Sequence, residues 1–189
     1  MTKRGEMLEL AILGLLTDSP MHGYELRKQV HRVLGTVRAL SYGTLYPRLR
    51  DLVDRGLITE LGRPAMSSRA RITYAVTPAG QERFATLLSV AGPQAWEDDV
   101  FDVHFAFFGR TDRAVRLRIL EGRRARLEER LAAIRANGPG GSTVMVDSYA
   151  AELHRHGLES AERDVRWLTG LIESERRAAG PLGSARHEE

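Results

Sequence analysis

The chain of 189 residues contains no cysteine, which excludes disulfides, thiolate metal sites and cysteine nucleophiles. Lysine is almost absent: Lys3 and Lys28 are the two lysines among 28 basic residues, and the rest are arginines. Apolar runs stay far shorter than the roughly 18 residues of a membrane-spanning helix, and Glu6 and Glu9 interrupt the place where a signal peptide would have its apolar core. We therefore expect a cytoplasmic protein without a membrane partner.

Charge is distributed unevenly along the chain. Residues 1–95 contain 13 basic and 8 acidic side chains, a balance of +5, whereas residues 96–189 contain 15 basic and 17 acidic side chains, a balance of −2. A polyanionic partner is therefore expected to contact the first half. The hydrophobic content of 42% is enough for a packed core, and the length suits one large domain or two small ones.

The segment from Ser41 to Ile58 predicts a short helix with two distinct faces. Its apolar stripe has helical spacing and consists of Leu45, Leu49, Leu52 and Val53. Its polar face, also spaced by three and four residues, consists of Thr44, Arg48, Asp51 and Arg55. A guanidinium group donates two parallel hydrogen bonds and therefore suits phosphate oxygens or a guanine edge. A surface helix with solvated charges would give the same pattern, so that alternative stays open here.

Pro47 indicates where this helix begins. Proline is tolerated in the first turn of a helix, where the amide hydrogens have no intrahelical partner. The helix is therefore expected to begin between Ser41 and Thr44, to have residues 44–47 as its N-terminal turn, and to stop at Gly56. A short helix that leads with its N-terminal turn is typical of helix-turn-helix proteins, which insert it into the major groove of DNA.

Two more helices are predicted before this segment. Residues 7–17 carry an apolar face broad enough to be buried on most sides, and a second helix opens at His22 and stops at Gly35. None of the three helices can bury its apolar stripe alone, so together they predict a helix-turn-helix core. Tyr24 and Lys28, near the start of the second helix, are candidates for contacts with phosphate.

A β-hairpin is predicted after this core. Residues 57–60 are β-prone, and residues 71–76 alternate in the way a half-buried strand does. The turn-rich segment 62–69 between them is basic, and a basic hairpin directly after a recognition-type helix is a wing, although a mobile solvated loop is the other interpretation. Thr77-Pro78 then caps and starts a fourth helix that runs towards Val90.

The second half predicts a separate helical domain. We expect a winged helix-turn-helix domain at 1–92, an α-helical dimerisation domain at 93–179 and a disordered tail at 180–189. Two long amphipathic helices form an antiparallel hairpin, which has little core of its own, so a second copy of the chain is the expected partner, with packing on the winged domain as the alternative. The expected interface residues are Leu117, Leu120, Leu127, Leu131, Leu153, Val165, Leu168 and Ile172.

The predicted fold is thus mostly α with a small β-hairpin wing, and four of its segments resemble the PadR-type winged-helix transcriptional regulators. They are residues 21–26 (MHGYEL), 43–49 (GTLYPRL), 52–58 (LVDRGLI) and 74–80 (YAVTPAG). The resemblance covers residues 7–90, and the long C-terminal region resembles the part through which such regulators dimerise. The chain departs from the family at Tyr42, where proline is frequent, and in the wing, where residues 64–66 (PAM) stand in a region usually richer in lysine and arginine. The resemblance implies a dimeric repressor of a nearby operon, released in some members by small aromatic compounds.

Sequence-specific binding to double-stranded DNA, at a pseudo-palindromic operator, is therefore predicted. The expected DNA-binding residues are Tyr24, Lys28, Ser41, Thr44, Tyr46, Pro47, Arg48, Arg63, Arg69 and Arg71. Arg48 is the best candidate for a base edge, and the wing arginines are expected to supply affinity with little sequence preference. An effector pocket for a small aromatic compound is predicted near Trp96, Phe101 and Phe105, with core packing of these rings as the alternative.

Neither an enzyme, a cofactor nor a metal site is expected. The sequence has no Gly-rich phosphate loop after a strand and no convincing Ser/His/Asp order. His154 and His156 are two residues apart, a spacing that suits chelation from a strand better than from a helix. The second candidate function is a protein-interaction module that keeps the winged fold without binding DNA. It predicts a neutral or acidic face on residues 44–55, which Arg48 and Arg55 argue against.

Overall fold

The computed structural model describes residues 3–34, 42–62, 72–90, 92–136 and 148–178, which form a mostly helical fold with one small antiparallel sheet. The elements are α1 (Lys3–Asp18), β1 (Met21–His22), α2 (Gly23–Val33), α3 (Tyr42–Asp54), β2 (Ile58–Leu61), β3 (Thr73–Val76), α4 (Pro78–Ser89), η1 (Pro93–Trp96), α5 (Asp98–Ala106), η2 (Phe108–Arg110), α6 (Arg113–Ala136) and α7 (Ser148–Arg177). By contacts the chain divides into two compact units, 1–112 and 113–189. The domain boundary at residue 92 stays a prediction. Within the described ranges, no helix is both long and apolar enough to span a membrane.

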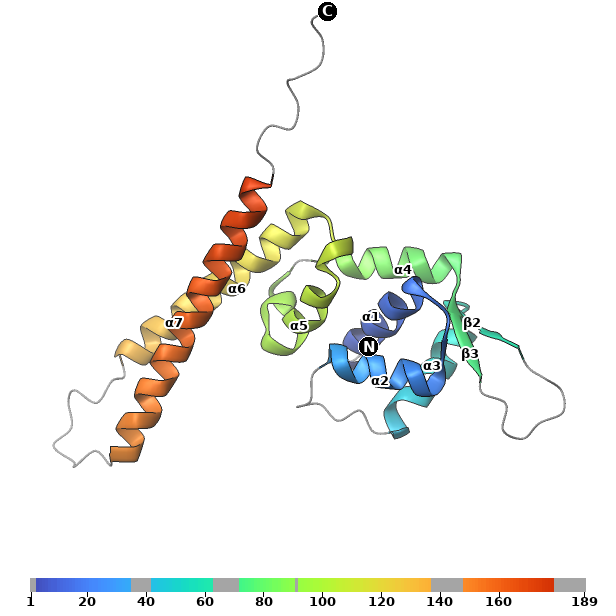
Figure 1. Ribbon diagram of the computed structural model, residues 1–189, viewed down its shortest axis with the longest axis horizontal. Coiled ribbons are helices and arrows are strands. Elements are labelled where there is room, and N and C mark those ends of the chain that lie inside the picture. Colours follow the sequence, from blue (N-terminus) through green and yellow to red (C-terminus); the bar gives the residue numbers. More distant parts are fainter. Residues whose placement is uncertain (1–2, 35–41, 63–71, 91, 137–147, 179–189) are drawn as a thin grey trace, which may run out of the picture. The chain divides into compact units, whose positions relative to one another are not determined.

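Helix α1 lies at the centre of the first unit, among α2, α3, α4 and the sheet (Figure 1). As the broad apolar pattern predicts, its buried side chains point to most sides: Met7, Leu8, Leu10, Ala11, Ile12, Leu13 and Leu16. Gly14 allows two aromatic rings to lie against this helix. A Cβ there would be 2.4 Å from the ring of Phe107 and 2.9 Å from that of Phe84, so a larger residue would force both rings to move. Helix α4, which carries Phe84, and the residue that follows α5, Phe107, therefore depend on this glycine for their close approach to α1.

The sheet has the strand order β1-β3-β2, with both pairs antiparallel. The predicted hairpin is confirmed as β2 and β3, which pair Glu60 with Tyr74. Strand β1 was not predicted. Its residue Met21 pairs with Tyr74 on the other edge of β3, and it places the start of α2 directly beside the sheet.

The turn after α3 is fixed by two glycines and a threonine. Gly56 has φ +68°, the left-handed conformation that favours glycine, and it ends α3 as predicted. Thr77 caps α4, as its sequence predicts, by accepting a hydrogen bond from the Gly80 amide at 3.1 Å, and its hydroxyl lies 2.7 Å from the Gly56 carbonyl. A Cβ on Gly80 would come within 2.0 Å of the Leu57 carbonyl oxygen, so α4 can pack on this turn because residue 80 has no side chain.

Helices α6 and α7 make up the described part of the second unit and run antiparallel. Near one end, Arg113 Nε donates to the Glu175 carbonyl at 2.8 Å. Near the other, His154 Nε2 lies 3.0 Å from the Ile134 carbonyl oxygen, to which it donates. An ion pair between Arg135 and Glu162 at 2.8 Å adds a contact between these two. The predicted antiparallel hairpin is therefore present.

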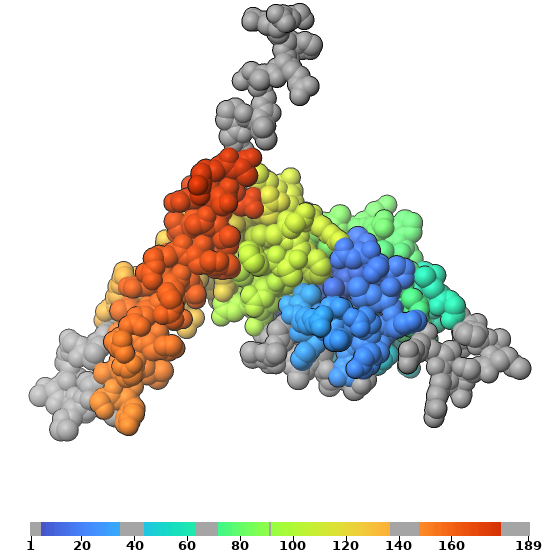
Figure 2. All heavy atoms as spheres, viewed as in Figure 1, coloured from blue at the N-terminus to red at the C-terminus, as the bar shows by residue number. Residues whose placement is uncertain are grey.

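Most of the apolar positions expected at a dimer interface are already buried within the single chain. Those that are buried are Leu120, Leu127, Leu131, Leu168 and Ile172. Leu117 and Val165 are half-buried, whereas Leu153 is 72% exposed. Helical spacing places these apolar residues on one stripe of each helix. It does not tell whether a stripe packs on the other helix of the hairpin or on a second copy of the chain. Figure 2 shows α7 in view along its whole length, and its exposed large side chains are Tyr149, Leu153 and Trp167.

Candidate nucleic-acid interface

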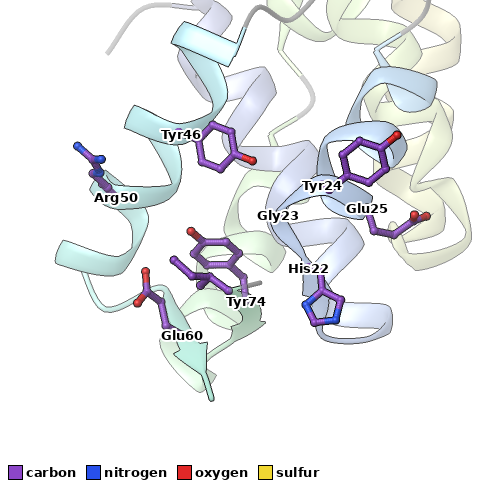
Figure 3. A pocket seen from close by; sticks show the side chains of 9 residues that line it. His22, Gly23, Tyr24, Glu25, Tyr46, Arg50, Glu60 and Tyr74 are labelled. Atoms are coloured by element: carbon purple, nitrogen blue, oxygen red, sulfur yellow. The ribbon is translucent and has the colours of Figure 1, made fainter. Parts of the chain in front are cut away.

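A groove lies where α2, α3 and the sheet meet, with a volume of about 770 Å³ (Figure 3). It is lined by His22, Gly23, Tyr24, Glu25, Tyr46, Arg50, Glu60, Ile72 and Tyr74. These side chains come from segments far apart in the sequence, and strand β1 brings the first four to the sheet. Two residues predicted to contact DNA, Tyr24 and Tyr46, are thus brought to one surface.

Three tyrosines give the groove its shape. Tyr24 is 70% exposed on α2, Tyr46 is half-buried on α3, and Tyr74 is buried on β3. In Figure 3 the rings of Tyr46 and Tyr74 lie next to each other. Both rings lie close to the start of α2, since a Cβ on Gly23 would be in ordinary van der Waals contact with them, 3.4 Å from Tyr74 Cε2 and 3.5 Å from Tyr46 Cε1. The groove therefore has an apolar floor with phenol groups at its surface, a combination suited to sugar and phosphate.

Tyr74 keeps its proton over the whole physiological pH range. Burial raises the pKa of its hydroxyl above the ordinary value of 10, and the nearby Glu60 and Tyr46 raise it further, against the opposing effect of Arg50. The sequence did not single this residue out as a functional one. Its alternation within β3 predicted a strand, which is compatible with a core tyrosine as well as with a groove.

Arg50 is an exposed arginine on the outer side of α3 that the sequence analysis missed as a site residue. In Figure 3 its side chain projects from α3 on the side away from α2. The signal that could have found it is its spacing from Tyr46 and Pro47, four and three residues back, which puts all three on adjoining positions of one helix surface.

The polar face of α3 was expected to be available to DNA or solvent, but in the structure it faces α1. The arginines of this face bind Glu9 of α1, whose side chain is fully buried. Arg55 donates to both carboxylate oxygens, at 2.9 and 3.1 Å, and Arg83 of α4 donates its Nε at 2.7 Å. Arg48 Nη2 lies 3.3 Å from Glu9 Oε2 and donates to the Gly5 carbonyl at 2.6 Å. Three helices are thus joined at one carboxylate, and we call these four side chains the Glu9 cluster.

Glu9 remains ionised inside this cluster. Burial by itself would raise the pKa of its carboxyl, but the hydrogen bonds and charges of Arg55 and Arg83 outweigh it, so the pKa lies below the ordinary 4.5. The same pairing raises the pKa of Arg55. Asp51 joins the two arginines of α3 from outside, with its Oδ2 2.9 Å from Arg48 and 3.1 Å from Arg55. The polar face therefore sets the position of α3 on α1.

The remaining predicted DNA contacts have mixed outcomes. Lys28 and Pro47 are exposed, and Thr44 is half-buried. Pro47 lies inside α3, which begins at Tyr42, so its missing amide leaves the Gly43 carbonyl without the usual helical donor. Ser41, Arg63, Arg69 and Arg71 lie outside the described residues.

The aromatic residues predicted to line an effector pocket pack largely against one another. Phe101 is buried and stacks on Phe105 with ring centroids 5.6 Å apart, and Phe108 contacts both rings edge-on or tilted, at 6.4 and 5.0 Å. Trp96 is half-buried at the end of η1. This packing fits the alternative that the sequence analysis left open, and a ligand site at these three residues stays a prediction.

Comparison with known proteins finds likenesses in the first unit and across the chain. Residues 12–86 match the Transcriptional regulator PadR-like family. Over 76 residues, or 40% of this chain, the sequence is 29% identical to the Negative transcriptional regulator PadR of Bacillus subtilis (strain 168). The match spans 42% of the length of that relative, so the activity and partners of the whole relative do not follow from it.

Among solved structures, the chain is similar to Bacillus subtilis PadR in complex with operator DNA, with 21% identity, a TM-score of 0.42, and coverage of 89% of this chain and 98% of that one. It is also similar to Bacillus subtilis PadR in complex with p-coumaric acid, with 20% identity, a TM-score of 0.41, and coverage of 90% and 99%. The PadR-like transcriptional regulator BC1756 from Bacillus cereus gives 22% identity, a TM-score of 0.38, and coverage of 90% and 99%.

Proposed function

Because residues 12–86 form a PadR-like transcriptional regulator domain, we propose that this protein binds DNA sequence-specifically as a dimeric repressor that a small molecule releases. The observation that carries the proposal is the groove on the first unit, where Tyr24, Tyr46 and Arg50 line one surface of α2 and α3. These are the two helices that a helix-turn-helix protein presents to DNA.

Helix α3 is the recognition helix in this proposal, and Arg50 takes the role first predicted for Arg48. A guanidinium must be unengaged and accessible to reach a guanine edge. Arg50 is exposed at the groove, whereas Arg48 is largely buried and bound to Glu9 and Gly5. Tyr46 and Pro47, beside Arg50 on the same surface, supply apolar contact with bases or sugars.

The start of α2 supplies contacts with the phosphate backbone. The Tyr24 hydroxyl and the Lys28 ammonium are both exposed on this helix, four residues apart and therefore on one side of it. Such contacts give affinity and register without reading the sequence. We propose the same role for Arg63, Arg69 and Arg71 of the wing, on the strength of their charge and their place in the hairpin sequence.

The second unit dimerises through the exposed apolar side chains of α7. Leu153 and Trp167 are exposed there, at 72% and 47%, and large apolar side chains on a helix favour a protein partner. A homodimer would place two recognition helices on half-sites of a pseudo-palindrome, about one helical turn (~34 Å) apart. Replacing Leu153 with arginine should shift full-length protein towards the monomer in sedimentation velocity, with Glu173→Arg, an exposed position on a different face of the same helix, as the control. An unchanged dimer would place the interface elsewhere.

A protein-interaction module without DNA binding is the second candidate. The charges of Arg48 and Arg55 oppose this candidate only weakly, because both guanidinium groups are engaged with Glu9. Glu25 and Glu60 at the groove favour this candidate. Arg50 and the exposed cations of α2 oppose it.

Binding of labelled duplexes, followed by fluorescence anisotropy, separates the two candidates. The duplexes are the chain's own upstream region and a scrambled sequence of equal length, each at two salt concentrations. A repressor binds the upstream region more tightly, and its affinity for both duplexes falls as salt rises, because binding releases counterions. Absence of binding to either duplex at low salt would reject DNA binding and leave the interaction module.

A further inference from the structure

A second pocket lies inside the first unit, between α1, α4 and α5, away from the groove. Its volume is about 270 Å³, slightly below the usual range for ligand sites (about 300–1,000 Å³). Most of its wall is apolar, with contributions from all three helices and from η1. The lining residues are Glu6, Met7, Leu10, Arg83, Leu87, Val90, Gln94, Ala95, Val100 and His104.

His104 is the unusual residue of this pocket. Its side chain is 5% exposed, and among the described residues its Nδ1 is buried without a hydrogen-bond partner. Burial lowers the pKa of the imidazole to about 4, so the ring is neutral at physiological pH and carries one donor and one acceptor nitrogen. A buried polar atom without a partner destabilises the fold, and it needs an explanation such as a ligand or catalytic role.

We propose that this pocket is the effector site of the regulator and that it binds a small neutral molecule with an apolar body and one hydroxyl group, which hydrogen-bonds to His104. The assignment as an effector site rests on the proposed function, whereas ligand binding itself does not. The apolar lining accounts for the body of the ligand, and the small volume limits it to one or two rings.

The charges around the pocket favour a neutral ligand over an acid. Glu6 on its wall would repel a carboxylate, and the neutral imidazole offers no compensating charge. Arg83 is the cation of the lining, but its Nε is already committed to Glu9 at 2.7 Å. A phenol or an alcohol avoids both costs, because its hydroxyl needs only a hydrogen-bond partner.

Arg83 also gives the pocket a route to α3. It lines the pocket and belongs to the Glu9 cluster, in which Arg48 and Arg55 hold α3 on α1. A ligand that displaces the Arg83 side chain would change the hydrogen bonding of the carboxylate that positions the recognition helix. Ligand and DNA should therefore weaken each other's binding by the same factor, as linkage requires.

The experiment titrates the full-length protein with p-cresol in a calorimeter and repeats the titration with phenol, indole and the charged analogue 4-hydroxybenzoate. p-Cresol is expected to bind at least about tenfold more tightly than 4-hydroxybenzoate. His104→Leu keeps the apolar volume but removes the hydrogen bond, and it should weaken p-cresol binding by about tenfold or more. Leu87→Phe, which enlarges a lining side chain and leaves His104 in the sequence, should weaken p-cresol binding as well. His156→Gln, a change to an exposed histidine of α7, is the matched control and should leave the affinity unchanged.

A thermal melt distinguishes loss of the site from loss of the fold. His104→Leu should raise the melting temperature of the unliganded protein, because it removes a buried nitrogen without a partner. If phenol, p-cresol and indole all fail to bind at millimolar concentration, or if p-cresol binds His104→Leu as tightly as the wild type, the proposal is wrong.

DNA binding with and without p-cresol separates this inference from the proposed function. p-Cresol should lower the affinity for the upstream duplex in the wild type and have no effect in His104→Leu. If p-cresol binds through His104 but the unliganded protein binds no DNA, the repressor function fails and the ligand site stands. If DNA is bound and p-cresol binds without changing that affinity, the effector role is overturned.

Discussion

The two sides of α3 carry the same kind of side chain and use it differently. Arg48 is 16% exposed and is bound to the buried Glu9 and to the Gly5 carbonyl, whereas Arg50 is exposed at the groove. Two residues along a helix differ by about 200° in direction, so the two guanidinium groups point to almost opposite sides. An arginine on a recognition-type helix can therefore contact bases only if its guanidinium group is not already bound to other residues of the protein.

The largest effect should follow from removing the carboxylate on the inward side. Glu9→Ala leaves three arginines around an empty site and should destabilise the protein by about 3 kcal/mol, at the lower end for a broken buried charge pair because the arginines are partly exposed and can be hydrated. Urea unfolding measures this change, with the exposed Glu82→Ala on α4 as the control. Equal stability of the two variants would mean that the Glu9 cluster does not hold the helices together.

The next effect distinguishes the two arginines directly. Arg50→Ala should cost about 1–3 kcal/mol in binding to the operator, reduce the preference for it over scrambled DNA, and change stability by less than about 0.5 kcal/mol. Arg48→Ala should do the reverse. It should destabilise the fold by about 1–2 kcal/mol and leave the ratio of operator to scrambled affinity unchanged once the folded fraction is considered.

Paired anisotropy and urea measurements on both variants test this exchange of roles. If Arg48→Ala removes the preference for the operator while Arg50→Ala keeps it, the assignment of the two sides of α3 is reversed.

Lowering the pH into the acid range should selectively weaken the contacts that the inward side of α3 makes with Glu9. Because the pKa of Glu9 is lower in the folded than in the unfolded chain, its ionised form stabilises the protein fully above the ordinary carboxyl pKa of 4.5. This stabilisation is lost as pH falls through the lower folded pKa. The stability difference between wild type and Glu9→Gln should therefore be constant at neutral pH and shrink below about pH 4.5. A difference that is already shrinking between pH 7 and 5 would show that another group controls it.

The smallest effect concerns the outward side of α2. Lys28→Ala should weaken binding to operator and scrambled DNA alike and lower the slope of log affinity against log salt by about one unit. Arg163→Ala, which removes an exposed charge of the second unit, controls for net charge. A loss confined to the operator would mean that Lys28 reads bases.

Local sequence signals predicted much of the fold. Three features depend on interactions within a few residues of the sequence. They are the left-handed conformation of Gly56, the Thr77 cap and the alternating strand after the turn. Strand β1 could not be predicted locally, because Met21 and His22 become a strand only through pairing with β3, some 50 residues away.

The site was harder to predict because helical spacing tells which residues share a face but not what that face meets. Arg48 and Arg55 were correctly grouped, yet the group faces α1 instead of solvent. The missing clue was Glu9, a lone acid within a helix that the sequence predicted to be buried on most sides. A buried carboxylate requires partners from elsewhere in the chain, and the basic face of α3 supplies two of them.

The division of the chain into two units has a spectroscopic consequence. The protein has two tryptophans, and each unit contains one: Trp96, half-buried in the first, and Trp167, 47% exposed in the second. Single-tryptophan variants, Trp96→Phe and Trp167→Phe, would give each unit its own emission signal during unfolding. The Trp167 signal would also move to shorter wavelength on self-association, so one dilution series could tell whether subunits separate before either unit loses its structure.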